Sequence, residues 1–273
     1  MKILVIFTCF NRKEKTENCI KSIGSNNPNC DITFVVVDDN SSDDTKKVVH
    51  ELQGKYKIFL LEGDGDLFYS GGMRVGMDYA LNSLKDNYDY LFMCNDDVDF
   101  FDLCIEKMIN QSGEQNDAVI VGAMQNLVGE LSYGAVKYIS GIKYRKLSIE
   151  EWSVEADTFN ANAVLIPYDA FKKVGSIDSY YLHSLGDFDY GLSLKRAGYY
   201  IYSSKEYVGM CENNSTSGGW MDVNLSRFER FHKKESIKGA PTRQWFYFLW
   251  KNFGLLIAIR GCITPYIRIL VGK

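Results

Sequence analysis

Four continuous apolar runs, each separated from the next by a helical pattern, constrain the fold of this chain more than any other feature. They cover Ile3–Phe7, Ile32–Val37, Ile58–Leu61 and Tyr90–Cys94. Unbroken apolar runs of this length are typical of strands that are buried on both faces of a parallel sheet. The alternation therefore predicts an α/β fold with a mixed, mostly parallel sheet flanked by helices.

Polar and acidic residues follow three of these runs, at the point where each strand is expected to end. They are Thr8–Arg12, Asp38–Thr45 and Asn95–Asp99. In open α/β folds ligands bind at this edge of the sheet, and carboxylates there can hold a hard divalent cation together with water and phosphate oxygens. The alternative for Asn95–Asp99 is an acidic loop that caps a helix or stays solvated. Taken alone, this stretch leaves both readings open.

A glycine-rich segment, Glu62–Gly72, opens onto an amphipathic pattern that predicts a helix from Met73 to Leu84. If Gly71 and Gly72 precede the start of that helix, their backbone N–H groups can approach a phosphate or a sugar. The same residues are also ordinary turn formers, which is the alternative.

The second half of the chain continues the pattern less regularly. Further strands are expected at Ala118–Met124 and Phe159–Pro167, with a short helix at Tyr168–Val174, while residues 126–157 give no clear assignment. A second acidic cluster, within residues 175–190, precedes a helix expected at Tyr190–Ala197.

Two carboxylates of that cluster, Asp187 and Asp189, either cap the helix that follows or belong to a functional site.

Composition excludes some classes of protein. The chain has 273 residues and a net charge of −4, which is no signature of nucleic-acid binding. Its seven cysteines form no CxxC pair and no zinc-like spacing, so we expect reduced, mostly buried thiols in a cytosolic protein. The run Ile3–Phe7 is too short for the core of a signal peptide and is expected to be the first strand.

The C-terminal segment, residues 206–273, is rich in aromatic, aliphatic and basic residues. Arg260, Pro265 and Arg268 interrupt its apolar stretch, which therefore falls short of the roughly 20 residues that span a bilayer. An amphipathic helix of this kind either lies in a membrane interface or packs on the core or at a dimer contact, so a homo-oligomer is among the expected states.

Taken together, these motifs resemble family 2 glycosyltransferases of the GT-A fold, the type that includes bacterial rhamnosyltransferases. The resemblance covers most of residues 1–205 and depends on four motifs in the right order: Thr8–Arg12, Val37–Thr45, Asn95–Val98 and Phe159–Tyr199. It implies a Rossmann-like GT-A domain at 1–205, with a nucleotide-binding half at about 1–100 and an acceptor half at about 101–205. A helical C-terminal extension would follow at 206–273.

The resemblance also implies roles for the strand-end residues. Asp39 would accept a hydrogen bond from the base N–H of the donor, Asp97 matches the last acid of the family's metal motif, and Asp99 offers a second register with Asp97. The expected metal is Mg²⁺ or Mn²⁺. The residues expected along the donor nucleotide are Thr8, Asn11, Arg12 and Asp39, while Asp96 would contact the donor ribose or the metal. Gly71 and Gly72, from the glycine-rich segment, are also expected to bind the nucleotide.

On the acceptor side, Asp187 falls on the family's catalytic-base position. A carboxylate there takes the proton of an acceptor hydroxyl as that oxygen attacks the sugar, and a single displacement inverts the configuration. Asp189 would support the site or bind the acceptor, and His183 would contact the acceptor.

Three departures from the family pattern concern the base and the metal. Gly186 stands where many relatives have Glu, and Ser193 stands where they have Arg. A His that often completes the metal site has no counterpart around residues 209–217, although Cys211 and Glu212 are nearby. These departures concern the metal geometry more than the base.

The resemblance implies an inverting glycosyltransferase that uses a UDP- or dTDP-sugar, with dTDP-rhamnose as the first candidate. Its acceptor would be a glycan or a lipid-linked glycan of bacterial surface polysaccharide synthesis, reached at the cytoplasmic membrane surface. The alternative is a catalytically silent nucleotide-sugar-binding or scaffold protein of a polysaccharide assembly complex. A nucleotidyltransferase is disfavoured because no lysine-containing glycine-rich loop follows the first strand.

Overall fold

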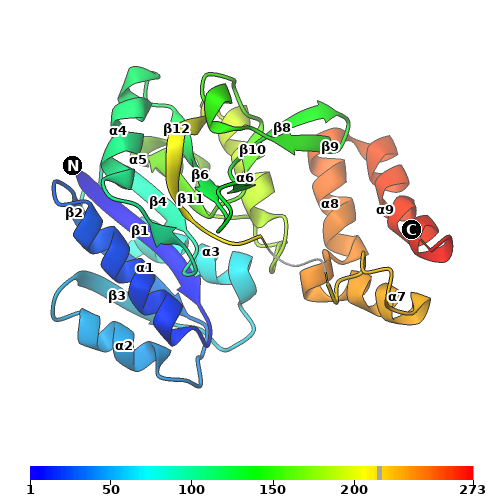
Figure 1. Ribbon diagram of the computed structural model, residues 1–273, viewed down its shortest axis with the longest axis horizontal. Helices are drawn as coiled ribbons and strands as arrows, with labels where there is room; N and C mark the ends of the chain where they lie inside the picture. Colours follow the sequence, from blue (N-terminus) through cyan, green and yellow to red (C-terminus); the bar gives the residue numbers. More distant parts are fainter. Residues whose placement is uncertain (214–216, 273) are drawn as a thin grey trace.

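A mixed sheet forms the centre of the computed structural model, which describes residues 1–213 and 217–272 (Figure 1). Its strands are β1 Lys2–Cys9, β2 Asp31–Asp38, β3 Lys57–Glu62, β4 Tyr90–Cys94, β5 Asp99–Phe100, β6 Val119–Gln125, β7 Leu131–Tyr133, β11 Ala163–Pro167 and β12 Ile201–Met210. Within the described residues they are ordered β3-β2-β1-β4-β11-β6-β12-β5, and β7 pairs with β6. The pairs among β1–β4 and the β6–β12 pair are parallel, whereas β11 is antiparallel to both of its neighbours.

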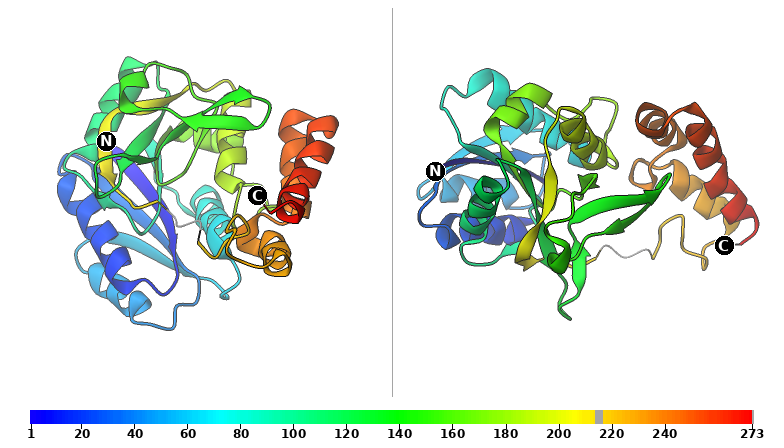
Figure 2. Two further views of the ribbon diagram at one scale, coloured as in Figure 1. Left: turned by 45° about the vertical axis from the view of Figure 1, so that its right-hand side comes forward. Right: turned by 90° about the horizontal axis from the view of Figure 1, so that it is seen from above.

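Helices cover both faces of this sheet, as the sequence predicted (Figures 1 and 2). One face carries α1 Lys13–Asn26, α2 Thr45–Leu52 and α4 Cys104–Glu114, and the other carries α3 Phe68–Ser83, α5 Tyr168–Val174 and α6 Gly186–Arg196. Successive side chains of β1 point to opposite faces, so Val5 belongs to one core and Ile6 to the other. This double burial explains why the strands are continuous apolar runs.

The region at 126–157, which had no assignment, contains most of a small antiparallel sheet. Its order is β10-β8-β9, with β8 at Ala135–Ser140, β9 at Lys143–Lys146 and β10 at Thr158–Phe159, and a short 3₁₀ helix, η1, lies at Ile149–Glu151. The β8–β9 hairpin projects from the central sheet toward the C-terminal helices (Figure 1).

The C-terminal segment is helical. It consists of α7 Arg227–Glu235, the 3₁₀ turn η2 Ile237–Gly239, α8 Thr242–Phe253 and α9 Leu255–Leu270. A separate apolar cluster joins α8 and α9 to the loop before α6, through Tyr181, Phe248, Leu249 and Ala258. Among the described residues, no helix combines the length and the apolar content needed to cross a membrane.

Three boundaries differ from those expected. β12 runs to Met210, so the central sheet extends past the domain boundary placed at residue 205. The helix expected from Tyr190 begins at Gly186, which puts Asp187 in its first turn. The helix expected from Met73 begins at Phe68, and this brings Gly71 and Gly72 inside it.

Candidate active site

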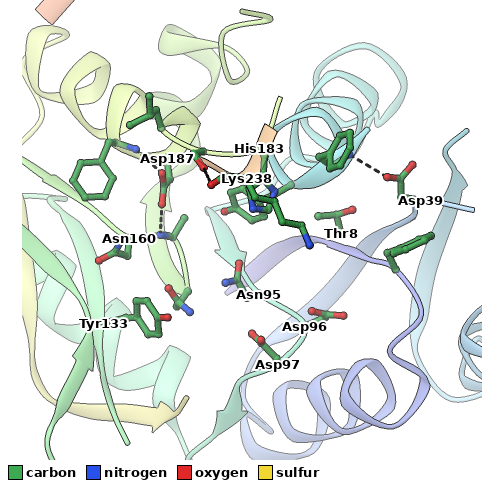
Figure 3. A pocket seen from close by; sticks show the side chains of 18 of the residues that line it. Thr8, Asp39, Asn95, Asp96, Asp97, Tyr133, Asn160, His183, Asp187 and Lys238 are labelled. Carbon is green, nitrogen blue, oxygen red and sulfur yellow. Dashed lines mark hydrogen bonds between the residues drawn. The ribbon is translucent and has the colours of Figure 1, made fainter. Parts of the chain in front are cut away.

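A cavity of about 590 Å³ lies at the carboxyl ends of the parallel strands (Figure 3). Its volume is in the range usual for sites that bind small molecules. One wall comes from the loops after β1, β2 and β4, and the other comes from the hairpin region, the start of α6 and the C-terminal segment. Of the residues expected in the site, those that line this cavity are Thr8, Arg12, Asp39, Asp96, Asp97, His183 and Asp187.

Asp39 organises the loop between β3 and α3. Its Oδ1 accepts hydrogen bonds from the backbone N–H groups of Gly65 (2.9 Å) and Leu67 (3.3 Å), and its Oδ2 accepts one from Phe68 (3.0 Å). A carboxylate has about four acceptor positions, so the protein uses three and leaves one. Asp39 is therefore a structural residue of the loop that also borders the cavity with one remaining acceptor position.

Asn11 joins two loops and does not line the cavity, contrary to its expected place along the nucleotide. Its side-chain oxygen accepts from the backbone N–H of Ser42 at 2.7 Å and of Asp43 at 3.3 Å, and its own N–H donates to Ser41. With φ at 51°, Asn11 also has the left-handed backbone that Asn tolerates well. These bonds fix the β1–α1 loop against the β2–α2 loop.

Gly71 and Gly72 do not have the position that phosphate binding requires. Both are buried in the first turns of α3, and the N–H of Gly71 donates to the carbonyl of Leu182. A Cβ on Gly72 would lie 2.3 Å from the hydroxyl of Thr8. The glycines therefore permit close packing of α3 against β1, and we withdraw the expectation that they contact the nucleotide.

Arg12 bridges the two acidic residues that follow β4. Its guanidinium lies 2.9 Å from Asp96 and 3.0 Å from Asp97. Asp96 is buried and also accepts from the hydroxyl of Thr16 at 3.2 Å. Burial raises the pKa of Asp96 to about 6, although Arg12 acts in the opposite direction. Asp97 is the more open carboxylate of the pair and faces the cavity (Figure 3).

Asp99 is separated from this arrangement. It lies in β5, is exposed, and lines a second groove with Asp97 and Glu212 instead of the main cavity. The thiol of Cys211 lies 4.0 Å from Asp97, and burial together with that charge raises its pKa to about 12, so it stays protonated at neutral pH. Within residues 1–213 and 217–272, no three His, Cys, Asp or Glu side chains group to hold a metal by themselves.

Two cavity carboxylates, Asp96 and Asp97, nevertheless fit a magnesium-type ion. Such an ion commonly takes only one or two protein carboxylates and fills its other positions with water and substrate phosphate. Arg12 already neutralises part of the charge of this pair, which limits the demand for a cation.

Asp187 faces the same cavity from the opposite wall (Figure 3). Its Oδ1 accepts from its neighbour Phe188 at 2.9 Å, and its Oδ2 accepts a long bond of 3.4 Å from the N–H of Ala161. Burial raises the pKa of Asp187 to about 6. No basic side chain contacts Asp187 among the described residues, so its carboxylate is held by backbone groups and is a stronger base than an ordinary Asp.

Gly186, the first departure from the family pattern, has a local cause. A Cβ at this position would lie 2.4 Å from the hydroxyl oxygen of Ser70 and 3.0 Å from Ile177. A glutamate has no room there, because the start of α6 packs directly against the start of α3.

Asp189 binds the C-terminal segment, which corrects its expected role at the acceptor. It is 2% exposed, and its carboxylate accepts from the ammonium of Lys251 at 2.7 Å and from the amide of Asn252 at 2.8 Å. It does not line the cavity. Asp187 and Asp189 thus have different surroundings, although they are two residues apart in one helix: Asp187 lines the cavity and Asp189 holds the C-terminal segment.

Three buried polar atoms in the cavity wall have no hydrogen-bond partner within the described part of the chain. They are the hydroxyl of Tyr69, the side-chain oxygen of Asn95 and Nδ1 of His183. Burial lowers the pKa of His183, and the charges of Lys238 and Arg12 act in the same direction. Because unpaired buried polar groups are costly, these atoms indicate a cavity made for a polar ligand.

Sequence reasoning missed several residues of the wall opposite the strand ends. Lys238, in η2, extends into the cavity near His183 (Figure 3) and pairs with no carboxylate among the described residues. An aromatic group faces the same space from the hairpin region, α6 and α8: Tyr133, Tyr138, Tyr144, Phe188, Trp245 and Phe248. Lys238 lies in the basic segment that the sequence singled out, but no local pattern distinguished it from its neighbours.

Known proteins resemble this chain in sequence and in fold. Residues 4–173 match the sequence model described as Glycosyl transferase family 2. A curated relative, GalNAc(5)-diNAcBac-PP-undecaprenol beta-1,3-glucosyltransferase of Campylobacter jejuni, is 31% identical over 136 residues. That match covers 48% of this chain and 41% of the relative, so the chain spans well under half of the relative's length.

Solved glycosyltransferase structures share the fold. S. aureus TarS 1–349 in complex with UDP-GlcNAc has a TM-score of 0.62 at 13% identity, covering 98% of this chain and 90% of its own. The mannosyltransferase PcManGT of Pyrobaculum calidifontis, with GDP-Man and Mn²⁺, has a TM-score of 0.61 at 10% identity, covering 99% and 73%. The architecture is therefore the GT-A glycosyltransferase fold.

Proposed function

Because the chain belongs to glycosyl transferase family 2, we propose that it transfers a sugar from a nucleotide diphosphate donor to an acceptor hydroxyl with inversion. The observation that carries this proposal is the convergence of Asp97 and Asp187 on one cavity, although they lie 90 positions apart in the chain. Asp97 would lie beside the departing diphosphate, and Asp187 beside the incoming hydroxyl.

The donor is proposed to carry uracil or thymine. The one acceptor position that Asp39 keeps suits the imide N–H of either base, and Thr8 borders the same part of the cavity. The TarS complex with UDP-GlcNAc supports a uridine donor by analogy of fold. Transfer of rhamnose stays a prediction from resemblance, and the name of the C. jejuni relative adds glucose as a candidate.

The diphosphate is proposed to lie in the cavity beside Asp97, within reach of two cations of the protein. Lys238 reaches the cavity from the C-terminal segment, and Arg12 reaches it from the β1–α1 loop. Asp97 and Asp96 would hold a Mg²⁺ or Mn²⁺ ion, as the Mn²⁺ complex of PcManGT suggests. Such an ion would neutralise the negative charge that develops on the leaving diphosphate.

Asp187 is proposed to act as the general base. The acceptor oxygen forms a bond to the anomeric carbon, and its proton passes to Asp187. The bond between the anomeric carbon and the diphosphate oxygen breaks, and its electron pair leaves on the diphosphate. The pKa of Asp187, about 6, is still below neutral pH, so the carboxylate is mostly ionised there, and because the pKa is raised it is a better proton acceptor than an ordinary Asp.

The acceptor is proposed to be a glycan on a lipid carrier in bacterial surface polysaccharide synthesis. The aromatic residues of the wall that contains Asp187 offer flat apolar faces against which sugar rings pack, as in many ligand pockets. The name of the C. jejuni relative, a transferase that acts on an undecaprenol-linked glycan, supports this class.

Asp187→Asn tests this proposal against the scaffold alternative. A base that supplies roughly 10²–10⁴-fold of the rate should lose that factor in turnover, while the donor affinity stays the same. Asp169→Asn is the matched control, because Asp169 is an exposed Asp in the first turn of α5, outside the cavity. Donor hydrolysis and transfer would be measured with UDP- and dTDP-sugars. Equal turnover in both variants, or no turnover in the native protein despite donor binding, contradicts the catalytic reading.

A further inference from the structure

The outward face of α9 carries a continuous apolar stripe. Seven apolar side chains in or next to this helix are about half exposed or more, and Leu256 is 83% exposed. The set is Leu255, Leu256, Ile259, Ile263, Ile267, Leu270 and Val271. Hydrophobic side chains scattered singly on a surface are ordinary, but a contiguous patch of this kind usually marks an interaction site.

Helical geometry shows that the stripe is one face. At about 100° per residue, the six exposed members from Leu255 to Leu270 fall within about 120° of the helix circumference. The buried residues Ala258, Gly261, Pro265 and Ile269 occupy the opposite side, toward α8. Arg260 projects beside the apolar stripe and is exposed. The helix is therefore amphipathic in an unusual sense, with its larger apolar side chains turned outward.

Charge identifies the surface that this face fits. From residue 217 on, the sequence holds ten Lys or Arg and three Asp or Glu, whereas the first 216 residues hold 21 and 32. The basic excess is thus confined to the segment that carries the stripe, and α9 itself has no acidic residue. An apolar helical face with basic flanks is the combination that binds an anionic lipid surface.

We propose that α9 docks the protein on an anionic membrane surface, with the stripe inserted at the boundary between headgroups and acyl chains. A second copy of the chain fits this face less well, because a two-fold contact would bring the same basic segments together. Helix α9 lies at the outer edge of the molecule in all three ribbon views (Figures 1 and 2).

Docking in this way would place the cavity close to the lipid. The indole N–H of Trp245, which lines the cavity from α8, donates to the carbonyl of Gly261 in α9 at 3.1 Å. A Cβ on Gly261 would lie 2.3 Å from Leu249, so the two helices are in close contact. The membrane-facing helix and the cavity wall therefore form one packed unit. This inference is read from the surface alone and does not depend on the proposed reaction.

Vesicle co-sedimentation of the full chain tests the proposal, using phosphatidylcholine with and without phosphatidylglycerol. We expect binding to the anionic vesicles, weaker binding at high salt, and roughly tenfold weaker binding for the variant with Leu256→Glu and Ile263→Glu together. Arg260→Gln should weaken binding about fivefold. The matched control carries Leu127→Glu and Val128→Glu, two equally exposed apolar residues in the β6–β7 turn, and should bind as the native protein does.

Three outcomes would overturn the proposal. One is a native protein that stays in the supernatant with anionic vesicles, and another is a stripe variant that sediments as well as the control. The third is a lipid-free dimer that the stripe variant converts to a monomer, which would assign the face to a second copy. Thermal shift with UDP checks that the variants keep their fold, and it also separates a failure here from a failure of the donor proposal.

Discussion

The two walls of the cavity are built in different ways. The wall with Asp39 and Asp97 consists of loops that directly follow parallel strands, so its side chains are placed by the backbone of the sheet. The opposite wall combines Asp187 with Tyr138 and Tyr144 of the hairpin region and with Lys238 of the C-terminal segment. The comparison teaches that the first wall depends on the strands' own geometry, whereas the second depends on how distant segments pack.

For the first wall, the largest effect is expected from Asp97→Asn, which removes its open carboxylate. If Asp97 holds the cation and orders the diphosphate, kcat/KM should fall by about 100-fold or more, and the stimulation by Mn²⁺ should disappear. Asp99→Asn is the comparison, because Asp99 lies outside the main cavity and should change kcat/KM less than about threefold. A larger loss of kcat/KM in Asp99→Asn than in Asp97→Asn would instead support Asp99 as a metal ligand.

Acidification should affect both walls together. Asp96 and Asp187 each have a raised pKa of about 6, and both are proposed to act as carboxylates. As pH falls below about 6, each becomes protonated, so kcat/KM should drop between about 10- and 100-fold per pH unit. In Asp187→Asn the residual activity should follow only the shallower slope. If kcat/KM falls with decreasing pH in the same way in the native protein and in Asp187→Asn, Asp187 is not the general base.

Breaking the attachment of the C-terminal segment should lower stability. Asp189→Asn removes the charge that Lys251 and Asn252 contact, and it leaves Lys251 with Asp178, at 2.8 Å, as its carboxylate partner. We expect a loss of about 2 kcal/mol in the free energy of unfolding. Glu114→Gln, in an exposed ion pair with Lys205, should cost less than about 1 kcal/mol. Denaturant unfolding of both variants provides the measurement.

The smallest effect is expected from Lys238→Ala in the second wall. Losing one charge-assisted contact to the diphosphate should raise the KM for the donor about 5- to 10-fold without changing the melting temperature. Lys238→Arg should recover part of this loss. The matched control is Lys233→Ala, an exposed lysine of α7 that does not line the cavity. An unchanged KM in Lys238→Ala would show that the second wall contributes no cation to donor binding.

The same difference between the walls decides what the sequence could predict. The strands, the two covered faces and the cavity positions of Asp39, Asp96 and Asp97 followed from apolar runs that end in acids, because this signal is local. The resemblance to the family also pointed to Asp187, which lines the cavity. By contrast, nothing local separates Asp187 from Asp189, and the partner that binds Asp189 lies 62 positions further along the chain.

Gly71 and Gly72 show a second limit of prediction from the sequence. Gly71 and Gly72 stand in a segment that suggests a phosphate loop, but α3 begins earlier and uses them to approach β1. A pattern of glycines indicates only that the backbone lies close to a neighbouring group. Whether that neighbour is a ligand or Thr8 depends on the register of a helix, which sequence periodicity fixes only within a few residues.

The contact between α3 and the loop before α6 bears on how substrates enter. The hydroxyl of Ser70 donates to the carbonyl of His183 at 2.8 Å, and the N–H groups of Ser70 and Gly71 donate to Leu182. These three bonds fasten the loop before α6 to α3, so a hinge opening between the two halves would have to break all of them. Because Lys251 and Asn252 likewise tie α8 to Asp189 of α6, we expect the C-terminal helices to move together with this loop, which would couple the release of a bound nucleotide to the surface on which those helices rest.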